Sequence, residues 1–558
     1  MWENVPDFLE LFRNFPVSIS VLFVVPIVLL SGPASPVMAA HEFPVFRMQQ
    51  FDLHQTQSGS RSSLVNMEAR PLTSDMLTRR CVVTRLSDLT IDKFKDAVQT
   101  LGAGAVLILL PKNTSVASLE QLEEWQQLER DLMTVEVPVA VYFAYEDKEL
   151  SKIYDDIKTA VTSDQAGSAF EALLGVASAS GYQMVVNVGE AKQIKDAAIT
   201  SLQGKLSGMG IDEQLPTIAV VAHYDAFGIA PSISFGSDDN GSGVVALLEL
   251  ARLLYADPRM QARYNLVFFL SGGGKFNYQG TKRWLEDNLD NPETSVLSDV
   301  DYVLCLDSIG KTDHMFLHVS KPPKEGTPAF SLVEVAKEIF KELNFTMVHK
   351  KINLAEETLS WEHERFSLHT QRLPAGTLSH LEDPQVLGRS SIFDVRSSEN
   401  DGKLERNVEY IAEVLARHVF NLTTKGYPEN MRVFSASMAV DSHFVKTWMD
   451  YLGSQARAAQ LFHKDHPFLT GLEQTFSKFV KDVKRFSAKA DKRDPEFVFY
   501  DRPDATMFAY RVKPAVFDLF LALGIASYLG MFYLALVNFN ILTEILPRPV
   551  SNMKAKQP

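Results

Sequence analysis

Short apolar runs alternate with helical patterns through the middle of the chain. Strand-like runs at 217–222, 265–270 and 302–306 are separated by helical stretches such as 244–255. Buried strands that alternate with amphipathic helices predict a parallel or mixed sheet covered by helices. We therefore expect residues 201–425 to form one α/β domain.

The flanking regions show different patterns. Apolar runs at 105–110 and 137–143 surround a helical pattern near 119–133, which predicts an N-terminal α/β lobe over 41–200. Residues 426–513 are predicted to be a helical region close to the membrane. They carry a basic cluster that is either a solvated helix face or a contact with lipid headgroups or an acidic partner. The cluster comprises Lys478, Lys481, Lys484, Arg485, Lys489, Lys492 and Arg493.

Both ends of the chain carry longer apolar segments. The run 17–30 is followed by small residues up to Ala40, which predicts a signal peptide over 1–40. Residues 515–538 are apolar except for Asp518, so we predict a transmembrane helix at 514–538 and a cytosolic tail at 539–558. Together these segments predict a single-pass type I protein whose bulk is lumenal. Small residues four apart on the helix (Ala522, Ala526 and Gly530) suit either a close partner helix or a lipid-facing surface.

Two kinds of short motif favour the endoplasmic reticulum membrane. Asn113, Asn344 and Asn421 begin glycosylation sequons, which are usable only in the lumen. Lys554 and Lys556 form a dilysine-like retrieval signal, although a positively charged tail that follows the positive-inside preference would look the same.

Composition narrows the possible functions. The formal net charge of -14 argues against nucleic-acid binding, which needs a basic face. The only two cysteines, Cys81 and Cys305, exclude a disulfide framework but leave one bridge open.

The candidate chemistry lies where strands of the central domain end. His223 and Asp225 close the first strand, Asp239 follows in the glycine-rich loop 236–243, and Asp307 follows the third strand. These segments resemble the di-zinc aminopeptidase family. The resemblance implies that His223, Asp239 and Asp307 occupy zinc-ligand positions, with Asp239 as the bridging carboxylate. Asp225 is a candidate to orient the imidazole of His223.

The same resemblance shows what this chain lacks. The family's general base and its neighbouring zinc-binding glutamate align with Gly274 and Lys275, and its last histidine ligand aligns with Ser390 in the segment 390–394. A di-zinc hydrolase needs ligands for two cations and a base that activates water. We therefore predict a pseudoenzyme with no cofactor, whose surviving polar side chains bond one another. Residual binding of a single metal is the alternative, and His380 is a candidate replacement ligand.

Several further segments (271–290, 319–323, 352–356, 361–366 and 490–500) resemble the nicastrin and nicalin branch of this family, and the short, cysteine-poor ectodomain favours the nicalin side. The resemblance implies a scaffold subunit of an endoplasmic reticulum complex. Its implied partners are the nodal modulator protein, a small multi-pass membrane protein and the translocon, with a role in multi-pass membrane protein biogenesis. A substrate-receptor subunit of the nicastrin type and a lumenal metallopeptidase with an altered ligand set are the alternatives.

Overall fold

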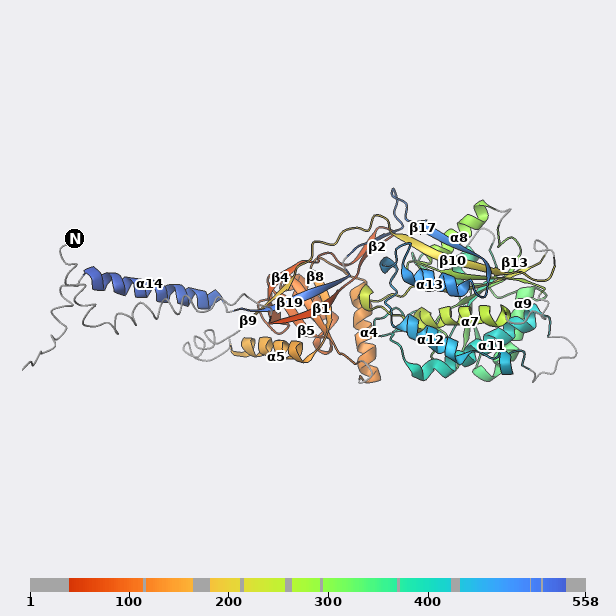
Figure 1. Cartoon of the computed structure of the whole chain (residues 1–558), viewed down its shortest axis with the longest axis horizontal. Coiled ribbons are helices and arrows are strands. Elements are labelled where there is room, and N and C mark those ends of the chain that lie inside the picture. The colour runs from red at the N-terminus through yellow and green to blue at the C-terminus, as the bar shows by residue number, and fades with distance from the viewer. Residues whose placement is uncertain are drawn as a thin grey trace, which may run out of the picture.

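The computed structural model consists of a barrel, a larger α/β domain on one side of it and a helix that extends from the other side (Figure 1). Helix α4 lies between the barrel and the large domain. The structure describes residues 40–113, 117–163, 181–210, 215–255, 263–291, 295–368, 372–422, 432–501, 503–512 and 515–537.

The N-terminal lobe is a closed barrel with the strand order β1-β19-β9-β4-β5-β6-β8. Its strands are β1 (His41–Arg47), β4 (Val65–Pro71), β5 (Cys81–Arg85), β6 (Ala105–Leu110), β8 (Ala140–Tyr145), β9 (Gly181–Val186) and β19 (Asp504–Val512). The accompanying helices are α3 (Ile91–Lys95), α4 (Leu119–Met133) and α5 (Lys148–Ser163). The predicted strand 105–110 and helix 119–133 are therefore confirmed. The helix begins at Ser118, which forms a capping box with Gln121.

The large domain contains an eight-stranded sheet with the order β15-β14-β16-β13-β11-β12-β10-β17. The strands are β10 (Ala198–Leu206), β11 (Thr217–His223), β12 (Asn265–Ser271), β13 (Val300–Leu306), β14 (Phe316–Val319), β15 (Thr346–His349), β16 (Ala375–Ser379) and β17 (Lys481–Lys489). The four central strands β16, β13, β11 and β12 pair in parallel, and antiparallel strands flank them. The predicted mixed sheet is confirmed, and its parallel centre brings four carboxyl-terminal strand ends to one edge.

Helices cover both faces of this sheet, as the continuous apolar runs of its strands require. One face packs against α7 (Gly243–Tyr255), α9 (Pro328–Ile339), α11 (Asp401–Val419), α12 (Ser442–Gly453) and α13 (Pro467–Phe476). The other face packs against α8 (Gln279–Asp290) and α10 (His363–Leu368). There the fully buried ring of Trp284 stacks on Phe269, with 4.1 Å between the ring centroids.

A four-stranded sheet lies beside these two bodies and consists of β18 (Phe497–Phe499), β2 (Gln50–Leu53), β3 (Thr56–Ser60) and β7 (Glu136–Val137). Strand β18 comes from the C-terminal part of the chain and pairs with β2 from the N-terminal part. Segments from the two ends of the folded body are thus joined by backbone hydrogen bonds.

The prediction of a helical region over 426–513 is wrong for its second half. Helices α12 and α13 are present, but Lys481–Lys489 is the edge strand β17, and β18 and β19 follow it. The partly buried side chains of Val483 and Phe486 contact the cores of the large domain. Lysines are common on exposed sheet edges because they discourage pairing with other chains, so charge alone did not indicate a helix. The barrel separates β17 from α14, so the basic cluster does not lie beside that helix (Figure 1).

Helix α14 (Ala515–Val537) lies at the C-terminal end of the described chain. None of the described helices has the length and apolar character needed to cross a membrane. The transmembrane span expected at 514–538 therefore stays a prediction. The signal peptide and the lysines at 554 and 556 lie outside the described residues.

The remaining sequence features fall into two groups. Cys81 and Cys305 are both free and buried, in the barrel and in the large sheet, so the bridge left open by the sequence does not form. The sequon residues Asn113, Asn344 and Asn421 are all exposed, and their glycosylation stays a prediction.

Candidate functional site

The three surviving ligand positions meet at the carboxyl edge of the central strands. His223 ends β11, Asp307 follows β13, and Asp239 lies in the turn that leads into α7. All three are buried, and each offers one ligand atom within 4.8 Å of the others. The sequence therefore predicted correctly which residues gather at this edge.

Two cationic side chains lie among these carboxylates. The ammonium group of Lys275 donates a hydrogen bond to Asp239 Oδ1. The guanidinium group of Arg389 donates from Nη2 to Asp307 Oδ2 at 2.6 Å, and its Nε lies 3.9 Å from Asp239 Oδ1. Lys275 and Arg389 thus supply internally the positive charge that bound metal ions would supply at such an edge.

The electrostatics of the cluster keep the carboxylates ionised. Burial by itself would raise the pKa of Asp239, but Lys275 and then Arg389 outweigh it and hold that pKa well below its usual range. The pKa of Asp307 is also lowered, because Arg389 outweighs the effect of burial there. In return, the two carboxylates raise the pKa of Arg389 despite its own burial. The site is therefore a paired network of fixed charges.

Arg389 was not predicted from the sequence, although it precedes the predicted position Ser390. Ser390 contributes its backbone amide, which donates to Asp239 Oδ2 at 2.7 Å. Arg389 also lies over the ring of Trp361, 4.4 Å from the ring centroid, and donates to the carbonyl of Ser360 at 3.0 Å. The segment that supplies a metal ligand in the resembled family thus supplies a cation and an amide donor here.

Gly274 occupies the expected base position for a steric reason. A Cβ atom built at Gly274 would fall on the ring of His223, closer than real Cβ contacts allow. Asp225 fixes this arrangement, because its carboxylate accepts hydrogen bonds from the amides of Gly274 at 2.8 Å and Lys275 at 3.1 Å. Asp225 thus holds the loop after β12 in place. Burial raises its pKa despite the nearby His223 and the two amide donors.

Glu362 is a further carboxylate neighbour of His223, and it was not predicted from the sequence. Glu362 Oε2 lies 3.7 Å from His223 Nδ1, while Oε1 accepts hydrogen bonds from Ser271 at 2.6 Å and Thr281 at 2.5 Å. Among the described residues, His223 Nε2 has no hydrogen-bond partner. Glu362 belongs to the segment 361–366, which resembles the nicastrin and nicalin branch. That resemblance implied no role for Glu362 in the site.

His380 does not replace the missing ligand. Its Nε2 lies 2.7 Å from Asp238 Oδ2, outside the cluster of ligand atoms. Asp238 also accepts from the amide of Gly310 at 2.9 Å, and its pKa falls to about 2 because His380 and Lys311 outweigh burial. The imidazole is therefore already used in a separate ion-paired network.

The residues present do not fit a pair of zinc ions. His223 Nε2 has no partner among the described residues and is a possible metal ligand. Both carboxylates of the cluster, however, already pair with cations. A metal ion would have to displace Lys275 and Arg389 and then share a buried space with two positive charges, which Coulomb repulsion opposes. The base position holds no proton acceptor. The arrangement can hold loops and charges in place but lacks the parts of a hydrolytic centre.

Helix α4 of the barrel lobe closes over the same loops. Glu129 accepts hydrogen bonds from the amides of Ile229 at 2.9 Å and Ile392 at 3.0 Å, and from the hydroxyl of Ser391 at 2.5 Å. Burial raises its pKa to about 7, although these three donors oppose that shift. A side chain from one lobe thus positions the segment that carries Arg389 in the other.

Comparison with known proteins places this geometry in context. The model of Peptidase family M28 matches residues 202–386, which include His223, Asp239, Lys275 and Asp307 but not Arg389. The crystal structure of the gamma-secretase component nicastrin is similar in fold, with a TM-score of 0.57 and 12% identity. The match covers 85% of this chain and 100% of that one.

Curated relatives match over nearly the whole length. The human BOS complex subunit NCLN is 50% identical over 545 residues, which cover 96% of each chain. The protein named nicalin in Caenorhabditis elegans is 31% identical over 525 residues, which cover 88% of this chain and 89% of that relative.

Proposed function

The chain belongs to the nicalin family, and from that premise we propose that it is a non-enzymatic scaffold subunit of a BOS complex in the endoplasmic reticulum membrane. In this role the lumenal body offers binding surfaces, and the former peptidase site serves as a rigid structural element. The human relative is named BOS complex subunit NCLN.

The observation that carries this proposal is the pairing of Lys275 with Asp239 and of Arg389 with Asp307. Loss of a catalytic residue alone would leave an open, metal-binding cleft. Here the chain instead provides its own cations, so the acidic residues are retained as buried ion pairs that hold loops. Such a site favours a structural function over a chemical one.

The membrane attachment and partners form the finer part of the proposal. The proposed single anchor is the apolar segment 514–538, in which α14 exposes large apolar side chains, including Leu523, Leu529 and Leu534. With a signal peptide at 1–40, the barrel and the large domain are lumenal. The proposed partners are the nodal modulator protein, a small multi-pass membrane protein and the translocon, with a role in biogenesis of multi-pass membrane proteins.

Mild-detergent affinity purification of the tagged full chain from membranes tests this function. We expect the same membrane proteins to be retained by the wild type and by His223→Gln, since assembly needs no metal ligand. Neither protein should cleave aminoacyl or peptide substrates above background, with or without a chelator. Retention of no membrane partner would contradict the scaffold role, and chelator-sensitive cleavage lost in His223→Gln would reinstate a peptidase.

A second function, that of a metallopeptidase with an altered ligand set, has one observation in its favour. His223, Asp239 and Asp307 each offer a ligand atom within 4.8 Å of the others, and His223 Nε2 has no hydrogen-bond partner among the described residues. Asp239→Asn with Asp307→Asn removes both carboxylates, and comparison of this variant with the wild type distinguishes the two functions. A peptidase would lose activity, whereas a scaffold has none to lose.

A further inference from the structure

A cavity of about 470 Å³ lies beside the paired-charge site and is lined in part by Trp361. The ring of His318 stacks on Trp361 with 4.2 Å between the ring centroids, and the guanidinium of Arg389 lies 4.4 Å from the same ring centroid. Two planar groups so close to one ring centre cannot share a face, so Trp361 separates His318 from Arg389. The Trp361 ring therefore separates the cavity from the ion-paired network.

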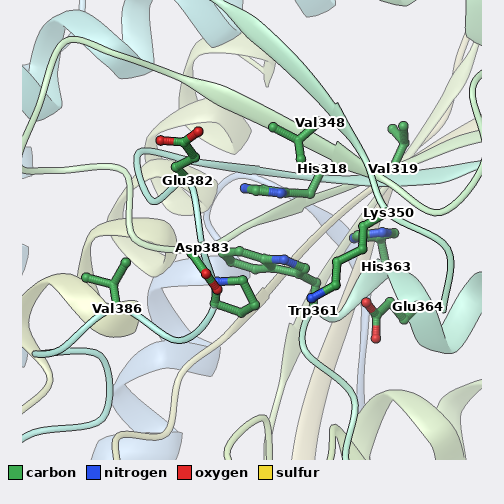
Figure 2. Close-up of a pocket in the computed structure, with 11 residues that line it drawn as sticks. His318, Val319, Val348, Lys350, Trp361, His363, Glu364, Glu382, Asp383 and Val386 are labelled. Carbon is green, nitrogen blue, oxygen red and sulfur yellow. The ribbon is translucent and has the colours of Figure 1, made fainter. Parts of the chain in front are cut away.

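Two buried imidazoles face this cavity (Figure 2). His318 Nε2 lies 2.8 Å from the carbonyl oxygen of Leu381, which can only accept, so Nε2 carries a proton and Nδ1 holds a lone pair. His363 Nδ1 lies 2.9 Å from Thr377 Oγ1. His318 is 4% exposed and His363 2%.

The imidazole rings of His318 and His363 are both neutral. In each ring one nitrogen has no hydrogen-bond partner in the described part of the chain. Burial lowers the pKa of His318, and it lowers that of His363 to about 3, with a smaller contribution from His318. No hydrogen bond from the described part of the chain reaches His318 Nδ1 or His363 Nε2. Both nitrogens are therefore available to a hydrogen-bonding ligand in the cavity, and His318 Nδ1 is an acceptor because its ring donates through Nε2.

The charge around the cavity selects the sign of that ligand. Figure 2 shows the carboxylates of Glu382 and Asp383 on one side of the stacked rings and Glu364 with Lys350 on the other. Glu382 and Asp383 are exposed at the rim, whereas Glu364 is buried, which raises its pKa. Lys350 is the single cationic side chain in the lining. Carboxylates therefore outnumber ammonium groups, and the cavity favours a cation.

We propose that this cavity binds a basic side chain, an arginine or a lysine, presented by a partner polypeptide. A guanidinium carries five N–H donors, which suits the acceptor Nδ1 of His318 below and the carboxylates of Glu382 and Asp383 at the rim. A cavity of this volume has room for one such side chain. The three-ligand convergence that a metal ion needs is found, among the described residues, at His223, Asp239 and Asp307 and not here. This inference does not depend on the scaffold function.

Calorimetric titration of the purified full chain with N-acetyl-arginine amide tests the proposal. The matched probe is N-acetyl-citrulline amide, which has nearly the same shape and no charge. We expect the arginine probe to bind about tenfold more tightly, because charge-assisted hydrogen bonds are roughly twice as strong as neutral ones. Equal affinity of the two probes, or binding of neither, would overturn the proposal. Equally tight binding of glycine amide would show that the cavity recognises amino termini and would also overturn it.

A pair of double variants locates the binding. Glu382→Gln with Asp383→Asn should weaken the arginine probe about fivefold, since each rim carboxylate contributes a solvent-exposed ion pair. The control is Glu123→Gln with Glu124→Gln, which removes the same charge from exposed positions on α4 and should leave the affinity unchanged. Equal weakening by both double variants would mean that only net charge matters, and no specific site would then remain.

Discussion

Two groups of buried polar side chains lie on either side of Trp361, and they differ in how their polar atoms are satisfied. On the Arg389 side, the carboxylates of Asp239 and Asp307 pair with cations of the chain itself. On the His318 side, two neutral imidazoles keep unpaired nitrogens beside a cavity, and no cation is buried among them.

The difference shows how a site closed by its own charges and a cavity open to a ligand can be told apart. A site whose charges are matched internally gains nothing from a ligand, because any ligand must first break ion pairs that are already desolvated. A cavity with unpaired acceptors gains hydrogen bonds when a donor enters. We therefore expect changes on the first side to alter stability and changes on the second to alter binding.

Arg389→Met should produce the largest effect on stability. It leaves Asp307 buried without its cation, which lowers the free energy of unfolding by about 4 kcal/mol. Urea denaturation of the full chain, followed by circular dichroism, measures this. Arg432→Met removes a half-exposed ion pair with Glu409 and serves as the control, with an expected loss below about 1 kcal/mol. Similar losses in both variants would remove the distinction between the site and the surface.

Gly274→Glu should come next. Restoring a carboxylate at the expected base position forces its Cβ onto the ring of His223, so we expect a loss of about 3 kcal/mol and no gain of peptidase activity. The same denaturation experiment measures it. At Gly402 in α11 an added Cβ meets no atom within 4 Å, so Gly402→Glu is the matched control and should be close to wild type. A stable Gly274→Glu variant would show that the loop can readily move away.

Glu129 offers a pH-dependent test, because it is a buried carboxylate held by hydrogen bonds without a cation. Its folded-state pKa of about 7 lies above the unfolded value of 4.5, so the folded state keeps a proton that the unfolded chain releases as the pH rises. Stability from this group is therefore lost between pH 4.5 and 7, by about 2 kcal/mol from pH 5 to 7. Glutamine does not titrate, so Glu129→Gln should not lose this stability. The difference in unfolding free energy between the variant and the wild type should therefore shift in favour of the variant as the pH rises from 5 to 7.

Unfolding free energies of both proteins at pH 5, 6 and 7 provide the measurement. Glu124→Gln, at an exposed position on the same helix, should run parallel to wild type at all three values. Parallel curves for Glu129→Gln as well would mean that Glu129 is ionised in the folded state throughout.

The smallest effect belongs to the cavity rim. Glu382→Gln with Asp383→Asn should change the free energy of unfolding by less than about 0.5 kcal/mol, because both side chains are exposed. The same denaturation experiment checks this. A loss as large as that of Arg389→Met would show that the rim carboxylates stabilise the fold as strongly as the buried ion pairs do.

The sequence predicted the parts of this molecule that depend on local pattern or on a motif. The strands that end at His223 and Asp307 and the loop with Asp239 lie where apolar runs and the family resemblance placed them. The loss of the base at Gly274 was also visible. Its steric cause was not, because the contact with His223 is made between positions 51 residues apart.

The features that the sequence missed depend on contacts between distant segments. Glu129 reaches the site from a helix of another lobe, about 260 residues before Ser391 in the chain. Strand β19 closes the barrel by pairing with β1, which lies more than 400 residues earlier in the chain. Arg389 was not predicted for a different reason. Metal ligands are histidine and carboxylate side chains, so a cationic side chain was not a candidate. Charged β17 was assigned to a helix because composition does not distinguish an edge strand from a solvated helix.

Metal analysis of the purified full chain shows directly whether Lys275 and Arg389 take the place of metal ions. After equilibration with zinc and removal of free ions, the account predicts far less than one zinc per chain and the same melting temperature with zinc or with a chelator. One or two zinc ions per chain, lost together with several degrees of melting temperature on chelation, would contradict it.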